Sequence, residues 1–281
     1  MEITVAKSAG FCFGVQRAVD SVYKELEENS GKIYTFGPII HNEQVVEDLN
    51  KKGIEVIDTV EQLKKIKEGT VVIRSHGVAK EIYDILEQQK LKMVDATCPF
   101  VTNIQKKVNK FSNEGYKIVI LGDENHPEVI GINGWCNDSA IITKDGSFNE
   151  KLSGKVCVVS QTTEKEENWD KTINNLSINT YDDLKSFNTI CAATEERQKS
   201  VYELSKKVDF MVVVGGKHSS NTTKLYEIAK KNCENTIHIE NAKEISKDIL
   251  KDKDIKTIGV TAGASTPDWI IKEVINIMEG F

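Results

Sequence analysis

The sequence predicts an α/β fold of three similar lobes, each a parallel sheet with flanking helices, arranged pseudo-threefold around a central site. Two observations predict this fold. Short apolar runs alternate with amphipathic segments of helical spacing along the chain, and such alternation is typical of parallel sheets covered by helices. Three kinds of turn also recur in a fixed order, which indicates an internal repeat. We expect the lobes to span residues 1–95, 96–188 and 189–281.

The composition is that of an ordinary globular protein. The chain has 281 residues, of which 39% are hydrophobic and 28% charged, enough for a sizeable core. A net charge of −6 disfavours a nucleic-acid partner. No apolar run is as long as a membrane-spanning helix, and residues 1–14 lack the pattern of a secretory signal. We therefore expect a cytoplasmic location and no membrane partner, with the six cysteines reduced or metal-bound.

The expected secondary-structure elements follow from apolar spacing. Short apolar runs predict strands at 3–5, 33–36, 71–73, 92–94, 118–121, 156–159, 189–191, 210–214 and 258–260. Residues that share one face predict helices after several of these strands, namely Val15, Ala18, Val19, Val22 and Leu26; Ile82, Ile85 and Leu86; Val101, Ile104, Val108 and Phe111; and Leu225, Ile228 and Ala229.

The first kind of turn places a cysteine directly before a helix. It occurs at residues 10–14, 96–99 and 190–194, which contain Cys12, Cys98 and Cys191. Beside Cys98, Pro99 suits the first turn of a helix. A helix N-terminus stabilises a thiolate, which is a metal ligand or a nucleophile. The alternative for one such cysteine is a small buried residue, but three copies favour a chemical role.

The other two kinds of turn are polar and follow strands. The second kind occurs at 37–42, 122–127 and 215–221, and the third at 74–77, 160–163 and 261–266. The spacing repeats, since Cys12 precedes His41 by 29 positions and Cys98 precedes His126 by 28. Because parallel strands end at the same edge of a sheet, all these turns are expected to face one cavity.

Three isolated cysteines suit an iron–sulfur cluster better than a structural zinc ion. Structural zinc is usually held by four ligands in closely spaced pairs, and the chain has no Cys-x-x-Cys pair. A cluster with three thiolate ligands leaves one iron without a protein ligand. The remaining cysteines, Cys136, Cys157 and Cys233, are not repeated and are expected to be structural.

Hydrogen-bond donors at the polar turns predict an anion site. Helix N-termini bind phosphate groups, and His41, His76, His126, Ser219, Asn221 and Ser265 lie at such positions. These donors suit a diphosphate, although the histidines could also bind a metal.

Glu128 is the candidate proton donor, because an enclosed carboxyl group has a raised pKa and can deliver protons; the alternative is a residue that only favours the helix start. Thr162 and Thr163 could relay a proton or bind a hydroxyl, and the alternative is an N-cap.

Two further groups of residues are expected to be structural. Only three of the 37 basic residues are arginines, Arg17, Arg74 and Arg197, and each lies near one of the turns. We expect them to hold other site residues in place rather than to contact a substrate. His238 lies in an apolar run and is expected to be structural.

Nine motifs in order resemble the 4-hydroxy-3-methylbut-2-enyl diphosphate reductase family, which catalyses the last step of the non-mevalonate isoprenoid pathway. They are Gly-Phe-Cys-Phe-Gly-Val at 10–15, Gly-Pro-Ile-Ile-His-Asn at 37–42, Arg-Ser-His-Gly-Val at 74–78, Asp-Ala-Thr-Cys-Pro at 95–99, His-Pro-Glu-Val at 126–129, Ser-Gln-Thr-Thr at 160–163, Thr-Ile-Cys-Ala-Ala-Thr with Arg-Gln at 189–198, Ser-Ser-Asn-Thr at 219–222 and Thr-Ala-Gly-Ala-Ser-Thr-Pro at 261–267. The resemblance covers essentially the whole chain. His218 stands where the family often has Asn, so it is given no role.

The resemblance implies a [4Fe–4S] cluster on Cys12, Cys98 and Cys191. It implies that the diphosphate substrate is surrounded by His41, His76, His126, Thr162, Thr163, Ser219, Ser220, Asn221 and Ser265, and that proton chemistry involves Glu128, Thr162 and His126. The implied products are isopentenyl and dimethylallyl diphosphate, with electrons from reduced ferredoxin or flavodoxin. Two other hypotheses are a non-redox cluster protein that senses oxygen or redox state and a zinc-dependent hydrolase built on the same turns.

Overall fold

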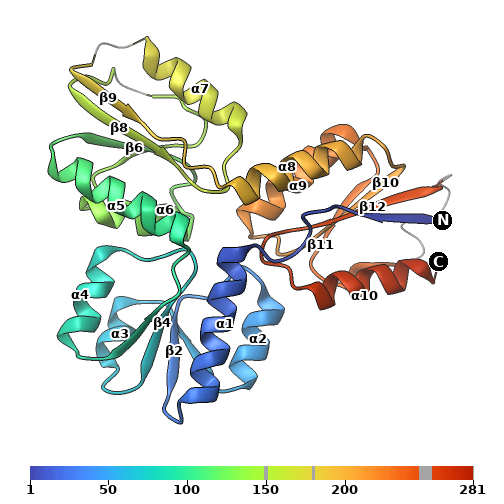
Figure 1. Cartoon of the computed structure of the whole chain (residues 1–281), viewed down its shortest axis with the longest axis horizontal. Helices are drawn as coiled ribbons and strands as arrows, with labels where there is room; N and C mark the ends of the chain where they lie inside the picture. The colour runs from blue at the N-terminus through green and yellow to red at the C-terminus, as the bar shows by residue number, and fades with distance from the viewer. Residues whose placement is uncertain (149–150, 179–180, 247–254, 281) are drawn as a thin grey trace. The chain divides into compact units, whose positions relative to one another are not determined.

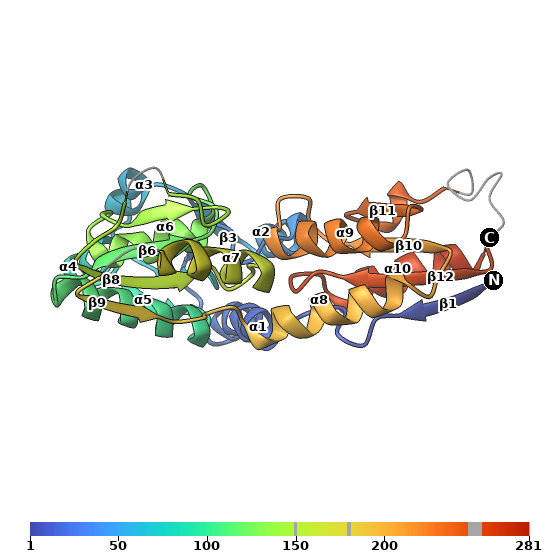
Figure 2. The same ribbon diagram turned by 90° about the horizontal axis from the view of Figure 1, so that it is seen from above.

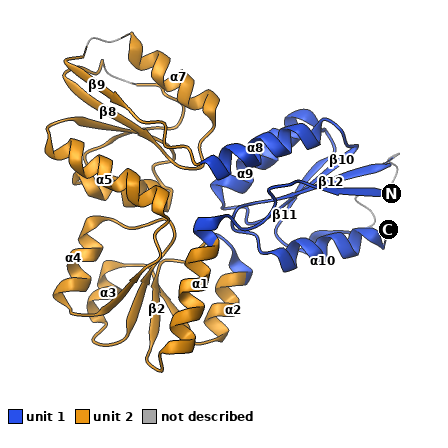
Figure 3. Cartoon of the chain, in the orientation of Figure 1, with its two compact units in different colours: residues 1–15, 41–44, 192–281 blue, residues 16–40, 45–191 orange. Residues whose placement is uncertain are grey.

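The computed structural model describes residues 1–148, 151–178, 181–246 and 255–280. Its contacts divide the chain into two compact units (Figure 3). Unit 1 contains Met1–Val15, His41–Gln44 and Ala192–Phe281, and unit 2 contains Gln16–Ile40 and Val45–Cys191. The described residues form three parallel four-stranded sheets, which confirms the predicted α/β class. None of the helices in the described residues is both long enough and apolar enough to cross a membrane.

Sheet B, in unit 2, follows the first apolar runs of the sequence. Its strand order is β3 (Ile54–Ile57), β2 (Ile33–Phe36), β4 (Thr70–Ile73) and β5 (Lys92–Asp95). Helices α3 (Val60–Lys65) and α4 (Lys80–Gln88) pack on one face through a shared apolar core. Helices α1 (Phe13–Glu28) and α2 (Glu43–Lys51) lie on the other side (Figure 1), where the predicted face of Ala18, Val19 and Val22 is buried.

Sheet C, also in unit 2, has the same strand order. It runs β7 (Ile141–Thr143), β6 (Lys117–Leu121), β8 (Lys155–Ser160) and β9 (Asp183–Ser186). Helices α5 (Pro99–Asn113) and α6 (Pro127–Asn133), with the short helix η1 (Gly134–Cys136), pack on one face, and α7 (Glu166–Ser177) packs on the other. The strands are apolar on both faces because helices cover both.

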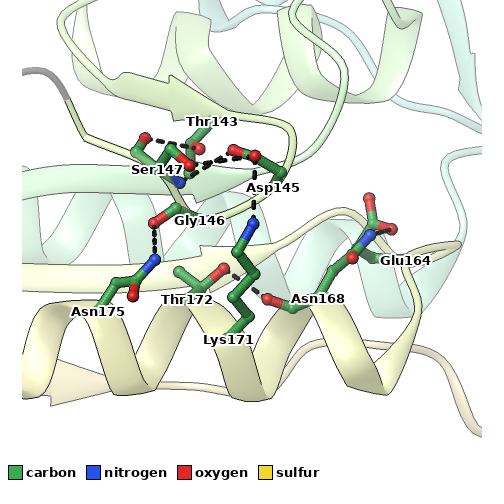
Figure 4. Close-up of polar contacts among 9 residues, drawn as sticks. All are labelled: Thr143, Asp145, Gly146, Ser147, Glu164, Asn168, Lys171, Thr172 and Asn175. Carbon is green, nitrogen blue, oxygen red and sulfur yellow. Dashed lines mark hydrogen bonds and ion pairs between the residues drawn. The ribbon is translucent and has the colours of Figure 1, made fainter.

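Polar contacts fix α7 against the loop that follows β7 (Figure 4). Lys171 forms an ion pair with Asp145 at 3.2 Å, and the Asn175 amide donates to the Gly146 carbonyl at 2.9 Å. Asp145 also accepts from the Ser147 backbone N–H at 3.0 Å, which closes the loop. These contacts fix the position of α7 on sheet C.

Sheet A, in unit 1, joins the two ends of the chain. Its order is β1 (Glu2–Val5), β12 (Thr257–Ala262), β10 (Phe210–Val214) and β11 (Thr236–Ile239), and β1 runs beside β12 (Figure 2). Helices α8 (Ala192–Ser205) and α9 (Ser220–Asn232) cover one face. Helix α10 (Asp268–Glu279) and the short η2 (Ala242–Glu244) cover the other.

The three sheets are repeats of one four-strand topology. The strands β2, β6 and β10 are each followed by a turn of the second kind, and β4, β8 and β12 by a turn of the third kind. The cysteine turns follow β5, β9 and β1, the outer strands next to β4, β8 and β12. In each sheet the strand order reverses between the strand followed by a turn of the second kind and the strand followed by a turn of the third kind. Ligands bind at such reversal points in open parallel sheets.

The sheet membership of β1 differs from the expected first lobe, residues 1–95. We expected β1 to belong with the strands that follow it, but it pairs with β12 over four residues. This pairing completes sheet A with the strand that sheets B and C obtain from β5 and β9. The boundaries near 95 and 188 remain a prediction.

The predicted strand at 189–191 is wrong. On the side of β8 away from β6, the paired strand is β9 (Asp183–Ser186), and residues 187–191 are irregular. Side chains take the hydrogen bonds that a strand would use. The Thr189 hydroxyl accepts from the Ser160 N–H at 2.8 Å, and the side-chain oxygen Oδ1 of Asn188 accepts from the Ile190 N–H at 3.1 Å. Bonds from side chains to the backbone, such as that of Asn188, compete with a sheet ladder. Strands β3, β7 and β11, short outer strands, were not predicted.

Candidate functional site

The backbone around each repeated cysteine is fixed in the same way. The N–H groups of Cys98, Cys191 and Cys12 donate to the carbonyl oxygens of Ser75 at 2.9 Å, Thr162 at 2.9 Å and Ala264 at 3.2 Å. All three acceptors belong to the third kind of turn. The repeat seen in the sequence is therefore also a repeat of hydrogen bonds. Each cysteine turn is tied to the polar turn of the neighbouring strand.

The six cysteines fall into two groups by environment. Cys12, Cys98 and Cys191 are partly exposed and directly precede α1, α5 and α8, whereas the other three are buried. Burial raises the pKa of Cys157 to about 12 and also raises the pKa of Cys136, so these thiols stay protonated. Three accessible sulfur donors at helix N-termini fit an iron–sulfur cluster that keeps one iron open. Cys12 lies in unit 1, and Cys98 and Cys191 lie in unit 2.

In unit 2, the turn that binds Cys98 also carries His76. The His76 ring contacts the His126 ring edge to face, with 5.5 Å between the ring centroids. His126 is the N-cap of α6, and its Nδ1 accepts from the Glu128 N–H at 3.1 Å. Because Nδ1 accepts a hydrogen bond, the ring proton of neutral His126 is on Nε2. His126 can therefore donate a hydrogen bond from Nε2 to a ligand.

Glu128 is buried, with 3% of its surface exposed, and both of its carboxylate oxygens bind Thr162. The Thr162 N–H donates to Oε1 at 2.6 Å and the Thr162 hydroxyl donates to Oε2 at 2.6 Å. The carbonyl of the same threonine accepts from the Cys191 N–H. Thr162 therefore links the candidate proton donor to a candidate cluster ligand.

Sequence reasoning gave no role to Gln161, which lies in the middle of this arrangement. Its side chain is fully buried, its Oε1 accepts from the Asp123 N–H at 3.1 Å, and its Nε2 donates to the Thr163 hydroxyl at 3.0 Å. Gln161 thus joins the turn that leads to His126 with the turn of Thr162 and Thr163. A polar residue directly after an apolar strand was the available signal.

In unit 1, the remaining candidates lie at the carboxyl edge of sheet A. The Ser265 hydroxyl donates to the His41 carbonyl at 2.9 Å, next to the Ala264 carbonyl that binds Cys12. Ser219 is the N-cap of α9 and accepts from the Thr222 N–H at 3.4 Å, and Ser220 is the first residue of that helix. Ser219 and Ser220 follow β10 and Ser265 follows β12, so these three residues lie at the same edge of sheet A.

Asn221 is the sharpest sign of a ligand site in unit 1. Its side chain is 5% exposed, yet neither its amide oxygen nor its amide nitrogen has a hydrogen-bond partner among the described residues. An unsatisfied buried amide is costly, at about 1–3 kcal/mol. Asn221 lies in the first turn of α9, beside the free N–H groups with which a helix N-terminus binds an anion.

His238 has the structural role that we expected. It lies in β11, and its Nε2 is 2.9 Å from the carbonyl oxygen of Gly215 in the second-kind turn of sheet A. Burial lowers the pKa of His238, so the neutral ring donates this bond.

Comparison with known proteins agrees with the motifs. The profile of the LytB protein family matches residues 3–279. The chain is 56% identical over 274 residues to 4-hydroxy-3-methylbut-2-enyl diphosphate reductase of Clostridium perfringens strain SM101, covering 98% of this chain and 97% of that protein. A solved structure of (E)-4-hydroxy-3-methyl-but-2-enyl diphosphate reductase, titled the terminal enzyme of the non-mevalonate pathway, is 41% identical with a TM-score of 0.70, covering 100% of this chain and 99% of that chain.

A second solved structure, that of the E-1-hydroxy-2-methyl-but-2-enyl-4-diphosphate reductase from Plasmodium falciparum, is 27% identical with a TM-score of 0.87, covering 98% of this chain and 87% of that chain. The predicted resemblance is therefore confirmed over nearly the full length. The chain belongs to the LytB family of 4-hydroxy-3-methylbut-2-enyl diphosphate reductases.

Proposed function

We propose that Cys12, Cys98 and Cys191 hold a [4Fe–4S] cluster with which this reductase acts on 4-hydroxy-3-methylbut-2-enyl diphosphate. The observation that carries the proposal is the position of Thr162, which binds the Glu128 carboxylate with two donors and the Cys191 N–H with its carbonyl. A proton donor and a cluster ligand are thereby held by one residue. When bound, the cluster supplies electrons and an iron that can accept the substrate oxygen.

Glu128, Thr162 and His126 would handle the proton. Removal of the substrate hydroxyl as water consumes two electrons and two protons for each product formed. Once protonated, the buried Glu128 would deliver its proton directly to a bound ligand or through the Thr162 hydroxyl, which would turn to accept from Glu128 and pass its own proton to the ligand. His126, with its proton on Nε2, would orient the substrate beside it. The expected products are isopentenyl and dimethylallyl diphosphate.

The diphosphate would be bound by donors from all three sheets. The proposed set is His41, His76, His126, Thr162, Thr163, Ser219, Ser220, Asn221 and Ser265. The unsatisfied amide of Asn221 and the N-terminus of α9 support this assignment in unit 1. A local cluster of donors suffices in an acidic chain, because the field near a helix N-terminus acts over a short range.

The electron donor in this proposal is reduced ferredoxin or flavodoxin in the cytoplasm. The sequence contains no dinucleotide-binding or flavin-binding motif from which an internal donor could be inferred. The half-exposed cysteines are consistent with a reducing compartment.

The test is anaerobic purification followed by iron and sulfide analysis and a turnover assay driven by dithionite. We expect about four irons and four sulfides for each chain, and two electrons consumed for each product. Cys98→Ala should lose the cluster, whereas Cys233→Ala, which alters a buried thiol away from the repeated turns, should retain it. A cluster without turnover would favour the sensor, and zinc without sulfide would favour the hydrolase; either result contradicts the proposal.

A further inference from the structure

We infer that Arg17 and Arg197 are positioning residues that hold the cysteine turns of Cys98 and Cys12 in their ligand-binding conformation, an inference that rests on the proposed cluster site. Each arginine lies shortly after one repeated cysteine in the sequence and bonds the turn of a different one, and Arg197 also donates to Ala193 in the turn of its own preceding cysteine. Arg17 follows Cys12 by five residues, and Arg197 follows Cys191 by six residues.

Arg17 holds the turn before Cys98 by two backbone carbonyls. Its Nη1 donates to the Thr97 carbonyl at 2.9 Å and its Nη2 donates to the Asp95 carbonyl at 3.2 Å. A planar guanidinium can span two carbonyls in this way, and an ammonium group cannot reproduce the fork. No ion pair of Arg17 is found within the described part of the chain, and its guanidinium contacts the two carbonyl oxygens of the turn instead.

The contact matters because it fixes the peptide that precedes the cysteine. The Thr97 carbonyl is bound by Arg17, and the N–H of the same peptide, on Cys98, donates to Ser75. A peptide plane held at both its oxygen and its nitrogen cannot rotate. The backbone that carries the Cys98 side chain is therefore fixed before any metal binds, as is common for the outer partners of metal ligands.

Arg197 acts on the turn of Cys12 one peptide further from the cysteine, because it binds the Gly10 carbonyl and the Cys12 N–H belongs to the next peptide. Its Nη2 donates to the Gly10 carbonyl at 2.8 Å, and its Nη1 donates to the Ala193 carbonyl at 2.9 Å in its own helix. Arg197 is 5% exposed, and the N–H of Cys12 is bound on the other side by Ala264. The Cys12 turn is thus held between α8 and the turn that follows β12.

The inference makes a selective prediction about individual thiols. Arg17→Gln should disturb Cys98 rather than Cys12, the cysteine that precedes it. Arg197→Gln should disturb Cys12 more than Cys191, because the bond to Gly10 joins α8 to a distant turn whereas the bond to Ala193 lies within one helix. The matched controls are Lys24→Gln on α1 and Lys199→Gln on α8, because both lysines are exposed on the same helices. Arg17→Lys keeps the charge and removes the fork, so it should restore the wild-type behaviour only in part.

The experiment uses the full chain in two states. In the iron-loaded protein, the rate of iron loss to a ferrous chelator is measured anaerobically. After iron removal, iodoacetamide alkylation is followed by mass spectrometry at Cys12, Cys98 and Cys191 separately. We expect iron loss to be about 10–100-fold faster in each arginine variant, the size typical of lost outer partners. The alkylation rate should change mainly at Cys98 for Arg17→Gln and mainly at Cys12 for Arg197→Gln.

Three results would overturn the inference: unchanged iron loss, equal change at all three thiols, or a change confined to the cysteine that precedes the arginine in sequence. Loss of the folded state in Arg17→Gln, followed by circular dichroism, would also overturn it, because Arg17 would then support the fold as a whole. If the wild-type chain binds no iron, the proposed function fails, while the alkylation pattern still tests the arginines separately.

Discussion

The carboxylate of Glu128 and the backbone and hydroxyl of Thr162 form a two-point contact, with both hydrogen bonds at 2.6 Å. The two donors hold the two oxygens of the carboxyl group in fixed positions. The contact joins α6 to the turn that follows β8, which lie far apart in the sequence. A buried acid held so firmly has a fixed direction, and this suits a group that must deliver one proton to one atom.

Glu128→Gln should reduce kcat by about 10²–10⁴-fold, the usual contribution of a positioned acid. The amide keeps the oxygen that accepts from the Thr162 N–H, and the Thr162 hydroxyl can accept from the new amide N–H, so the fold should persist. Iron content and substrate affinity should stay close to wild type. The measurement is single-turnover reduction together with iron analysis. A variant with near-normal kcat would show that Glu128 is not the acid.

Asn221→Leu should separate stability from function. The substitution removes two buried polar atoms that have no partner in the described part of the chain and keeps a similar volume, so the free energy of unfolding should rise by about 1 kcal/mol. The KM for the diphosphate should increase by about tenfold or more, because the ligand loses its amide contacts. Asn232→Ala, at the other end of α9, is the control and should leave KM unchanged. Unfolding curves and steady-state kinetics on the two variants test this; a less stable Asn221→Leu chain with normal KM contradicts it.

Gly146→Ala should destabilise the protein by about 2–4 kcal/mol. Gly146 has φ +75°, and an added Cβ would lie 2.6 Å from the Thr172 Cα in helix α7. Gly154→Ala is a matched control, because Gly154 has φ +81° but open space around the added methyl group. The control should cost only about 1–2 kcal/mol from its backbone conformation. Urea unfolding of both variants measures the difference, and equal losses would show that contact with α7 is unimportant.

His238 should make stability depend on pH. Burial lowers its pKa in the folded state below the ordinary value of 6.5, so the unfolded chain binds the proton more readily. Its contribution to stability is complete above pH 6.5 and is lost as the pH falls from 6.5 through the folded-state pKa. His238→Gln should flatten this part of the profile of unfolding free energy against pH. The exposed His218, changed to Gln, is the control. An unaltered slope in His238→Gln would refute the prediction.

Much of the architecture was readable from the sequence because the repeat combines strand, turn and helix signals. The order of the nine turns placed Cys98, Glu128 and Thr162 at the carboxyl edges of parallel strands, as the structure shows. Local patterns could not show that β1 pairs with β12, since strand pairing is a tertiary choice. They also misplaced the strand before Cys191, because side-chain bonds of Asn188 and Thr189 have no signature in hydrophobic spacing.

The same limits apply to the candidate site. Motifs identified the residue types. The two hydrogen bonds between Thr162 and Glu128, and the two that Gln161 makes to Asp123 and Thr163, depend on how the elements pack in three dimensions. The arginines were expected to support other residues, and the structure gives Arg17 and Arg197 particular carbonyls to bind. The scarcity of arginine in a lysine-rich chain indicated that these residues have a special role, but it did not identify the carbonyl groups that they bind.

The pairing of β1 with β12 determines when the Cys12 turn can form during synthesis of the chain. Strand β12 and Ala264, the acceptor for the Cys12 N–H, are synthesised long after β1 and Cys12 themselves. Sheets B and C can form before β12 is made, whereas the Cys12 turn waits for β12 and the turn that follows it. A ribosome stalled before residue 257 would therefore hold a chain whose Cys12 turn lacks both its neighbouring strand and its backbone partner.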